Sequence, residues 1–553
     1  MSLQHYFIHI ITHKTCLCCI LRAPEKKLAC GHGLCDICIG TLGEQSLEEK
    51  YLFAIETCPF CGKPNSLQPF RLMPPTAGVR LLSIDGGGSR AIVPLVFLRF
   101  LQNALVKFEV PLAEIFDFVC GTSSGGIVAI GLFLMRWSPE ECISKFETLA
   151  RKTFPSQNDK IITFGKLVLL YLRDGRYSSQ PIEEAFRNEL GKDIKMFNPL
   201  SGDTRVAVTT TTVKASKPCL ITNYNGNVRD GDKGYEIVRA SKSNQYASLS
   251  EAASCTSAAP WFFKPKAIEY LGTFQDGGLQ HNNPLKIALW EIGFLWPQKD
   301  SPDFALSIGT GYSETLLPSR TVGPCSPVHE GFLARLFKIF MKSLDGEKMW
   351  RDFHNSLPEN QRHRFHRLNV KLEGREPATD DTAAIPALKQ QVMDYICSQM
   401  PLVRIIDSII ASSFYFEFED CPEYHDDMWN CNGNIFCRLP APLRARKQLY
   451  TELLRTSSYF LIFGRPVPCV ERKMKSAPPF KCRVTFSLRN LDENVRITIR
   501  GITSAPMTIS GLPRPAKELL EMQRIEAPFG AVNHNRSPKP LPRIPAKRKY
   551  RID

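Results

Sequence analysis

The amino-acid sequence predicts an α/β protein with a central, mostly parallel sheet flanked by helices. A small Cys-rich module precedes the sheet, and a helical and then a β-rich C-terminal region follow it. Twice, an apolar run ends in a glycine-rich turn and leads into a helical pattern, at 79–107 and at 115–135. Eight Cys and His residues with metal-ligand spacing lie between Cys16 and Cys61. From Ser412 onward the hydrophobic pattern has a period of two residues, which is typical of strands.

Length and composition describe a folded, multidomain protein. The chain has 553 residues, so we expect about three or four domains. Hydrophobic residues make up 43% and charged residues 23%, a balance that excludes an intrinsically disordered chain. The net charge of +15 favours anionic partners, namely phospholipid surfaces, acidic proteins or nucleic acid, without selecting among them.

The cysteine content and the first residues indicate an intracellular protein. Nineteen cysteines in so long a chain do not predict the disulfide framework of a short secreted domain. Residues 1–13 lack a basic flank before an apolar core, so we expect no signal peptide and reduced thiols. The uncharged stretch 118–135 is roughly long enough to span a bilayer. Its glycines and paired serines favour a buried strand, turn and helix instead.

The Cys-rich module contains three CxxC pairs and one CxH pair. Two ligands separated by two residues can bind one tetrahedral zinc ion, whose binding then supplies the folding free energy of so short a segment. The alternative is a Cys-rich loop of unrelated residues. The candidate ligands are Cys16, Cys19, Cys30, His32, Cys35, Cys38, Cys58 and Cys61.

This pattern, with its Cys58-Pro59-Phe60-Cys61 ending, resembles a RING-type zinc finger. The resemblance implies two structural zinc ions with interleaved ligands. One set is Cys16, Cys19, Cys35 and Cys38, and the other is Cys30, His32, Cys58 and Cys61. It also implies docking of a partner protein, such as a ubiquitin-conjugating enzyme. Two departures leave ubiquitin-ligase activity open: Cys18 stands where many ligases carry an aliphatic contact residue, and Gly62 where many carry arginine.

The segment after the linker at 66–78 predicts an anion-binding turn. The apolar run 79–84 reads as a buried parallel strand, and a helix is expected from about 92 to 107. Between them stands Asp85-Gly86-Gly87-Gly88-Ser89-Arg90, whose backbone N–H groups can approach an anion closely. The turn also matches the dinucleotide-binding pattern GxGxxA, so a nucleotide-binding protein is one alternative.

The next unit predicts a nucleophile elbow. A short apolar strand at 115–120 leads into Gly121-Thr122-Ser123-Ser124-Gly125 and then into an apolar helix at 126–135. This GxSxG sequence between a strand and a helix holds the central serine in a strained turn with its hydroxyl exposed. Ser123 is therefore the candidate nucleophile.

A candidate base lies further along the chain. Residues 270–274 read as a strand that leads into Asp276-Gly277-Gly278. An Asp-Gly pair alone is usually only a turn. Here it follows a strand in a chain that already has an elbow and an anion turn.

Together these motifs resemble the patatin-like phospholipases over residues 79–312. Their three signatures, Asp-Gly-Gly-Gly, GxSxG and Asp-Gly-Gly/Ala, occur here in the family's order, with Ala91 where the family commonly has glycine. The resemblance implies a serine lipid acyl hydrolase of the phospholipase A, lysophospholipase or lipase type. It implies a Ser123–Asp276 dyad and no catalytic cofactor, so that hydrolysis is calcium-independent. Its implied oxyanion hole comprises Gly86, Gly87, Gly88 and Arg90. The flanking motif residues are Gly121 and Gly125 in the elbow and Gly277 and Gly278 beside the base.

An aspartate with its solution pKa near 3.9 is a weak base, so we expect the site to exclude water and raise that pKa. His281, five residues beyond Asp276, offers a triad as an alternative. A further alternative is a RING-type ubiquitin ligase or adaptor whose patatin-like domain only binds lipid.

The expected domains are a zinc finger at 1–68, a catalytic domain at 79–325, a helical extension at 326–410, a β-rich domain at 411–512 and a basic, largely disordered tail at 513–553. An amphipathic segment at 332–344 reads as a surface helix. Asn432-Gly433 predicts a hairpin turn. We expect a cytoplasmic protein at a membrane or lipid-droplet surface. The basic tail adds a nuclear address as an option, and nucleic acid is not an expected partner.

Overall fold

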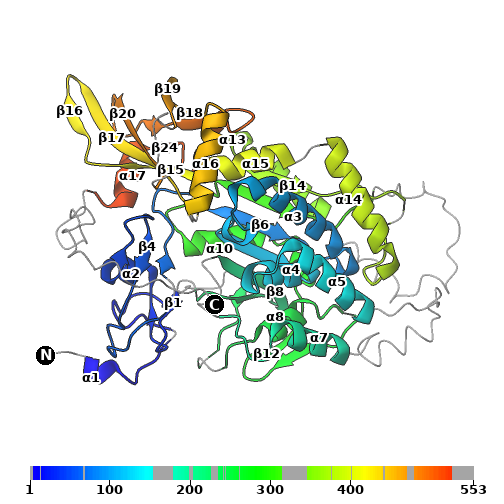
Figure 1. Ribbon diagram of the computed structural model, residues 1–553. Helices are drawn as coiled ribbons and strands as arrows, with labels where there is room; N and C mark the ends of the chain where they lie inside the picture. The colour runs from blue at the N-terminus through cyan, green and yellow to red at the C-terminus, as the bar shows by residue number, and fades with distance from the viewer. Residues whose placement is uncertain are drawn as a thin grey trace, which may run out of the picture.

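The computed structural model describes residues 4–12, 14–66, 69–153, 179–197, 204–225, 234–240, 242, 245–260, 262–299, 301–313, 345–374, 376–399, 402–439, 443–469 and 479–525. The chain forms one large sheet with helices on both faces, beside a Cys-rich module and a set of smaller C-terminal sheets (Figure 1). In Figure 1 the Cys-rich module and the C-terminal sheets lie toward the left, and α5 (Pro139–Thr153) and α14 (Ile385–Gln399) lie toward the right.

The central sheet has nine strands and is mixed but mostly parallel, as the sequence predicts. The order of its main strands is β10-β9-β8-β7-β6-β13-β14. In addition, β12 pairs with β8, and β11 pairs with β12. The neighbours β7–β8, β6–β7, β6–β13 and β13–β14 are parallel, whereas β8 is antiparallel to both β9 and β12. The strands are β6 (Arg80–Ile84), β7 (Phe118–Thr122), β8 (Arg205–Thr212), β9 (Pro218–Thr222), β10 (Glu236–Ile237), β11 (Lys266–Ile268), β12 (Gly272–Asp276), β13 (Phe304–Ile308) and β14 (Phe365–Leu368).

Two layers of helices cover the sheet because its strands are apolar on both faces. Leu82 and Ile84 of β6 pack into the larger core, and Leu81 of the same strand packs into the smaller one. The larger core contains side chains of α3 (Ile92–Leu105), α4 (Ser124–Ala129), α5, α7 (Gln180–Leu190), α8 (Leu249–Thr256), α14 and α15 (Leu402–Ala411). The smaller core contains side chains of α10 (Leu285–Leu295) and α12 (Gly346–Ser356).

Two apolar segments of membrane-spanning length are parts of this core. Residues 88–108, which include α3, are long and apolar enough to cross a membrane by length and composition alone. Nine side chains of α3 are buried, as expected of a core helix. The uncharged stretch 118–135 forms β7, the elbow, α4 and a following π-helical turn at Ile130–Leu134, so it does not form one helix.

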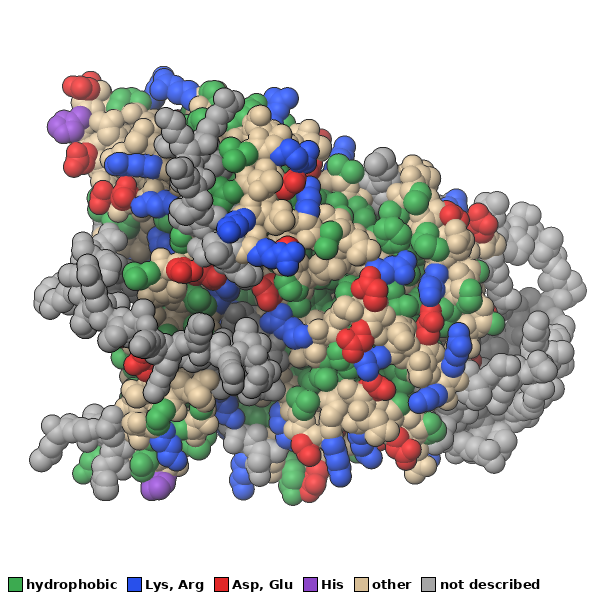
Figure 2. Space-filling view, viewed as in Figure 1, with side chains coloured by type: hydrophobic (Ala, Val, Ile, Leu, Met, Phe, Trp, Pro, Cys, Tyr) green, Lys and Arg blue, Asp and Glu red, His purple; other side chains and the backbone are tan. Residues whose placement is uncertain are grey.

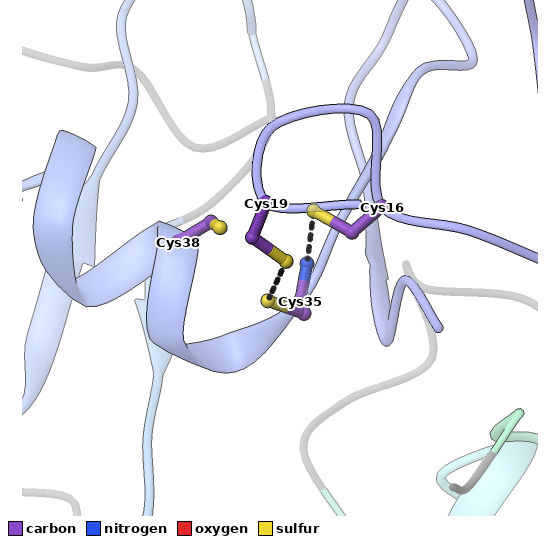
Figure 3. A group of neighbouring side chains, drawn as sticks. All are labelled: Cys16, Cys19, Cys35 and Cys38. Atoms are coloured by element: carbon purple, nitrogen blue, oxygen red, sulfur yellow. Dashed lines mark hydrogen bonds between the residues drawn. The ribbon is translucent and has the colours of Figure 1, made fainter. Parts of the chain in front are cut away.

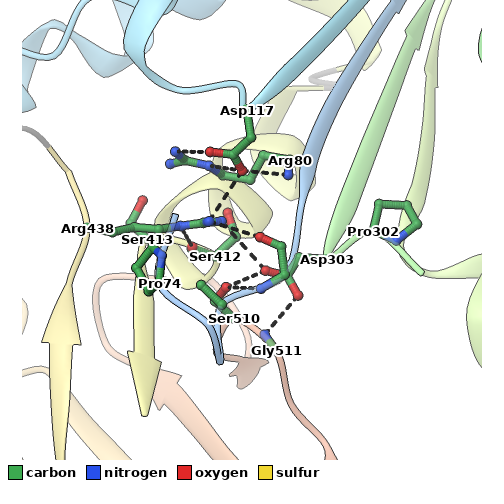
Figure 4. A network of polar contacts seen from close by, with 12 residues as sticks. Pro74, Arg80, Asp117, Pro302, Asp303, Ser412, Ser413, Arg438, Ser510 and Gly511 are labelled. Atoms are coloured by element: carbon green, nitrogen blue, oxygen red, sulfur yellow. Dashed lines mark hydrogen bonds and ion pairs between the residues drawn. The ribbon is translucent and has the colours of Figure 1, made fainter. Parts of the chain in front are cut away.

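The C-terminal sheets are bound to the amino ends of the central strands through a buried charge network (Figure 4). Arg438 pairs with Asp117, just before β7, at 3.3 Å and with Asp303, just before β13, at 3.6 Å. Asp117 also pairs with Arg80 of β6 at 3.1 Å, and Asp303 Oδ1 accepts a hydrogen bond of 2.8 Å from the Gly511 N–H. Five segments that are distant in sequence are thereby joined at one end of the sheet.

The Cys-rich module is packed at the same end of the sheet. Asp36 at the start of α2 (Asp36–Leu42) pairs with Arg205, the first residue of β8, at 2.9 Å. Tyr51 and Lys50 both bind Glu417, which is 1% exposed and lies on β15 (Phe414–Phe418) of the C-terminal region. The module's short elements are α1 (Gln4–Phe7), β1 (Lys26–Lys27), β2 (Gly33–Leu34), β3 (Glu44–Gln45), β4 (Leu52–Ala54) and β5 (Phe70–Arg71).

The expected helical extension at 326–410 also contains a strand. Besides α12, α13 (Glu359–Arg362), α14 and α15, it holds β14, which is parallel to β13 in the central sheet. The extension is therefore partly continuous with the catalytic domain. The surface helix expected at 332–344 lies outside the described residues.

The predicted hairpin turn at Asn432-Gly433 is wrong. Both residues lie inside β17 (Met428–Cys437), and the turn is at Asp426 and Asp427, whose φ angles are 50° and 59°. β17 pairs with β15, β16 (Glu423–His425) and β20 (Lys481–Leu488). Gly433 is required by packing, because a Cβ there would lie 2.3 Å from the Phe416 ring.

The other strands of the C-terminal region are β18 (Tyr459–Ile462), β19 (Arg465–Pro468), β21 (Asn494–Val495), β22 (Ile497–Arg500), β23 (Met507–Thr508) and β24 (Arg514–Pro515). Two helices accompany them, α16 (Leu443–Arg455) and α17 (Ala516–Gln523). The tail expected to be disordered from 513 is therefore folded at its start, where Leu519 of α17 is fully buried. Residues 526–553, which carry the basic cluster, lie outside the described residues.

The positive charge of the chain is not gathered into one patch on the face that Figure 2 shows. Lys and Arg side chains lie there among Asp and Glu side chains.

Candidate functional site

The carboxyl ends of β6, β7, β12 and β13 form the candidate active site. Ser123 follows β7, and its backbone has φ 55° and ψ −126°, a conformation that non-glycine residues rarely adopt. Its N–H donates to Thr256 Oγ1 at 2.9 Å. Gly125 lies so close to β6 that a Cβ there would come within 2.6 Å of the Ile84 carbonyl oxygen. The strained elbow predicted from the sequence is thus present.

The sheet brings Asp276 next to Ser123. Asp276 ends β12, where it pairs with Thr210 of β8, and β8 in turn pairs with β7 up to Thr122. Ser123 and Asp276 line one cavity, where the Ser123 hydroxyl acts to lower the pKa of Asp276. Asp276 Oδ1 accepts a hydrogen bond of 2.6 Å from the Gly278 N–H. Two residues that are far apart in the sequence therefore meet at neighbouring strand ends.

The surroundings of Asp276 suit a group that gains and loses a proton near neutral pH. Its side chain is buried, with a relative exposure of 5%. This burial raises the pKa of Asp276 to about 6, although the Ser123 hydroxyl and the Gly278 N–H favour the charged form. The side chain is thus buried and its pKa raised, as expected, and the ionised carboxylate would be a stronger base than an exposed aspartate.

The glycine turn runs beside Ser123, and most of its N–H groups already have acceptors. Gly86 N–H donates to the Asn282 carbonyl at 3.1 Å, and Gly87 N–H donates to Ser124 Oγ at 3.2 Å. Gly88 N–H has no hydrogen-bond partner among the described residues. Gly88 is thus the residue of the turn whose donor is free for a ligand.

Arg90, at the end of the glycine turn, is buried and forms an ion pair. Its side chain is 7% exposed and binds the carboxylate of Glu376, which lies well outside the three motifs. Burial lowers the pKa of Arg90 to about 10, so the guanidinium remains charged at neutral pH. Gly121 and Gly277 take up close-packed backbone positions rather than contacting the cavity.

The cavity between Ser123 and Asp276 has apolar walls. Its volume is about 90 Å³, and its apolar lining includes Ile127, Phe146, Leu149, Ile182, Phe262 and Phe263. A second cavity of about 40 Å³ shares Ile127, Phe146 and Leu149 with the first and extends toward Trp137 and Phe186. An apolar space beside a serine and a buried carboxylate can accept a hydrocarbon chain.

His281 does not line this cavity. Its ring lies edge-on against Trp290, with 6.2 Å between ring centroids, and its carbonyl accepts a hydrogen bond of 2.7 Å from Thr122 Oγ1. Burial lowers the pKa of His281 to about 4. The geometry therefore favours Asp276 over His281 as the partner of Ser123.

The Cys-rich module groups its eight candidate ligands as the RING resemblance implies. Cys16, Cys19, Cys35 and Cys38 converge in one group (Figure 3), and Cys30, His32, Cys58 and Cys61 in another. The Sγ atoms of Cys19 and Cys35 are 3.8 Å apart, and His32 Nδ1 lies 3.3 Å from Cys30 Sγ and 3.6 Å from Cys58 Sγ.

These separations fit tetrahedral zinc. Bonds of about 2.3 Å to sulfur and about 2.0 Å to nitrogen put two sulfurs about 3.8 Å apart and sulfur and nitrogen about 3.5 Å apart. His32 Nε2 lies 3.1 Å from the Phe7 carbonyl oxygen, which would fix the tautomer that leaves Nδ1 free for a metal. The donor set therefore fits two zinc ions held by these eight residues.

Several residues at the active site were not assigned a role from the sequence. Thr256 contacts the elbow and Asn282 contacts the glycine turn, and nothing local to either residue indicated these contacts. Glu376 and Thr379 give no motif signal at all. Thr379 lines the cavity and its carbonyl accepts a hydrogen bond of 2.7 Å from the Ser89 N–H, a contact that only the fold creates.

Comparison with known proteins matches the segment that contains Ser123 and Asp276 to one protein family. The family model described as patatin-like phospholipase matches residues 82–289. The chain is 29% identical over 303 residues to calcium-independent phospholipase A2-gamma of Oryctolagus cuniculus, covering 54% of this chain and 36% of that protein. It is 30% identical over 260 residues to the cGAMP-activated phospholipase of Vibrio cholerae serotype O1, covering 44% and 68%. It is 31% identical over 245 residues to patatin-like protein 2 of Arabidopsis thaliana, covering 40% and 54%. The chain thus spans about a third of the phospholipase A2-gamma relative and two thirds of the bacterial one.

Proposed function

The chain belongs to the patatin-like phospholipase family, and on that premise we propose that it hydrolyses acyl ester bonds of lipids, with Ser123 as nucleophile and Asp276 as base. The observation that carries the proposal is that Ser123, in its strained turn, and the buried Asp276 carboxylate line the same cavity, whose walls are apolar. Relatives named as phospholipases support a phospholipid or similar lipid ester as substrate.

In the proposed first half-reaction, Asp276 takes the proton of Ser123 Oγ as that oxygen attacks the ester carbonyl carbon. The carbonyl oxygen becomes an oxyanion, which we assign to the free Gly88 N–H. Gly87 N–H becomes available to it when the Ser124 side chain turns away. The bond to the alcohol oxygen then breaks, Asp276 returns its proton to that leaving oxygen, and the acyl group stays on Ser123.

In the second half-reaction, water attacks the acyl-enzyme while Asp276 again takes a proton. The bond to Ser123 Oγ breaks, the serine recovers the proton, and the fatty acid leaves. Arg90 supports the developing negative charge from the side of the turn, with part of its own charge offset by Glu376. We propose that this chemistry needs no calcium, in keeping with the relatives named as calcium-independent.

The proposal is tested on the full chain with a fluorophosphonate ester mimic and with phospholipid vesicles. We expect covalent labelling of the peptide that contains Ser123, and release of free fatty acid that EGTA does not reduce. Ser123→Ala should abolish both. Failure of the wild-type chain to be labelled, or fatty-acid release by Ser123→Ala, would contradict the proposal. Mass spectrometry of the lipids left by wild type and Ser123→Ala identifies the head group and acyl position.

Access to such substrates requires contact with a lipid surface. We propose a cytoplasmic protein that associates peripherally with membranes or lipid droplets. Flotation with vesicles separates this behaviour from that of a protein that acts only on dispersed lipid, which would stay in the unbound fraction.

A second proposed function concerns the Cys-rich module. We propose a RING-type finger with two structural zinc ions, in which zinc supplies the folding free energy of the module and the module docks a partner protein. The module lies at the amino ends of the sheet strands and Ser123 at the carboxyl ends, so it does not contribute to ester chemistry. Ile20, Leu21 and Leu47 are at least 73% exposed on the module and offer apolar contacts.

In one version of this proposal the partner is a ubiquitin-conjugating enzyme and the chain acts as a ubiquitin ligase. An experiment can distinguish this version from docking alone. Autoubiquitylation that depends on zinc would support it. Its absence, with the zinc sites loaded, would leave docking without ligase activity. A chain that retains neither zinc nor any bound partner would contradict both versions.

A further inference from the structure

The aspartate that begins the glycine turn is held by an arginine far outside the family segment. Asp85 is 2% exposed, so its carboxylate is buried. Arg367 of β14 binds it with two parallel hydrogen bonds, Nη1 to Oδ1 at 3.1 Å and Nη2 to Oδ2 at 2.7 Å. The family model ends at residue 289, before β13 and β14 begin.

The Arg367 guanidinium donates four hydrogen bonds to three side chains, and only an arginine can make this set of contacts. Besides binding Asp85, Nη1 donates to Ser307 Oγ at 2.7 Å and Nε donates to Glu347 at 3.2 Å. The guanidinium carbon lies 6.0 Å from the centre of the Trp350 ring. Lysine presents one ammonium group and cannot bind the two carboxylates and the hydroxyl in this fixed planar arrangement.

Arg367 is the buried cation of this network, whereas Arg351, which lies 3.9 Å from Glu347, is largely exposed. Arg367 is the cation shared by Asp85 and Glu347, and Asn369 Nδ2 also donates to Glu347 at 2.7 Å. Burial raises the pKa of Asp85, and Arg367 opposes that rise. Without Arg367, the Asp85 carboxylate would be buried near Glu347 with no cation, a costly state that the turn can relieve by moving.

The far end of the glycine turn is bound to the same extension. Ser89 N–H donates to the Thr379 carbonyl at 2.7 Å, and Ser89 Oγ donates to the Asp381 carbonyl at 3.1 Å. Arg90 binds Glu376. The turn that contains the free Gly88 N–H is thus attached at both ends to residues 345–381, while Gly88 itself remains available.

We propose that Arg367 is a positioning residue for the oxyanion-binding turn: by fixing Asp85, it sets the place of the Gly88 N–H relative to Ser123. This inference rests on the proposed ester hydrolysis. It predicts that loss of the Arg367–Asp85 contact weakens binding of the transition state more than binding of the substrate, because the donor meets the oxyanion only after attack.

The test compares the full-length wild type with Arg367→Lys and Asp85→Asn. In Asp85→Asn, Arg367 and Glu347 remain as one buried pair of opposite charge, so we expect this variant to fold. Arg364→Lys is the matched control, since Arg364 precedes the same strand and donates to the Leu512 carbonyl, away from the turn. Each variant is assayed for kcat and KM, for inhibition by a fatty-acyl trifluoromethyl ketone, which forms a tetrahedral alkoxide on serine, and for inhibition by a non-hydrolysable ether phospholipid.

We expect Arg367→Lys and Asp85→Asn to lower kcat by about 100-fold, the effect of a misplacement of about 1 Å, with KM changed less than about 3-fold. Affinity for the trifluoromethyl ketone should fall in parallel with kcat, and affinity for the ether lipid should not. Equal loss of both affinities, or collapse of the folded state in both variants, would assign the pair to overall stability and overturn the inference. So would variants as active as Arg364→Lys. A wild type without Ser123-dependent hydrolysis would instead refute the proposed function itself.

Discussion

Replacing Asp276 by asparagine should abolish hydrolysis and stabilise the fold at the same time. The amide keeps the size of the carboxylate and can still accept the hydrogen bond of the Gly278 N–H, but it cannot act as a base. A buried carboxylate is held in its charged form at a cost to the folded state, and the variant removes that cost.

The size and pH dependence of the increase in folding stability follow from the pKa of Asp276. Burial raises this pKa from 3.8 to about 6, a difference of about two units, each equivalent to about 1.4 kcal/mol. The folded state therefore binds the proton more tightly than the unfolded state, so the wild type loses stability as pH rises from about 4 to about 6. At pH 8 the variant should be more stable by up to about 3 kcal/mol, and near pH 4 the two proteins should be equally stable.

The measurement is the melting temperature of wild type and Asp276→Asn at several pH values between 4 and 8, together with fatty-acid release. We expect a difference that opens above about pH 4, reaches roughly 3 °C for a chain of this length and stays constant above about pH 7. A variant that is less stable than wild type at pH 8, or a difference independent of pH, would refute the assignment of a raised pKa to a buried carboxylate. Retained hydrolysis would refute its role as base.

Three further outcomes are expected. His281→Ala should retain hydrolysis within a few-fold of wild type, because the His281 ring faces Trp290; a loss as large as that of Asp276→Asn in the vesicle assay would favour a triad. The pH profile of kcat/KM should rise through about pH 6 and then level off, as Asp276 must be ionised to act; no rise between pH 5 and pH 7 would contradict this. Chelation should release two zinc ions per chain, measured by atomic emission, and lower the melting temperature of the Cys-rich module while the initial hydrolysis rate is unchanged; a stoichiometry below one would reject the paired sites.

The sequence predicted the parts of the active site that depend on local structure. The glycine turn, the elbow and the Asp-Gly-Gly motif each follow a strand, and each occurs where the fold has one. The mostly parallel sheet is confirmed, and the family segment agrees with the expected resemblance. These features could be predicted because a strand, a tight turn and a helix each depend on a few neighbouring residues.

Predictions that depended on a residue's partners were less successful. Asn432-Gly433 reads as a hairpin turn, yet Gly433 is fixed by its contact with Phe416 of another strand. The residues Phe365-His366-Arg367-Leu368 carry no strong strand signal, yet they extend the central sheet as β14 because β13 offers them a free edge. In both cases tertiary contacts outweighed the local preference.

The sequence by itself determined which chemical groups this protein has: a strained serine, an acidic residue after a strand, an anion-binding turn and eight metal-ligand candidates. The tertiary structure decided which of them meet. The pairing of β7, β8 and β12 brings Ser123 to Asp276, and β14 brings Arg367 to Asp85. Such meetings join residues that are distant along the chain, and they arise from the burial of whole strands and helices, which no short stretch of sequence specifies.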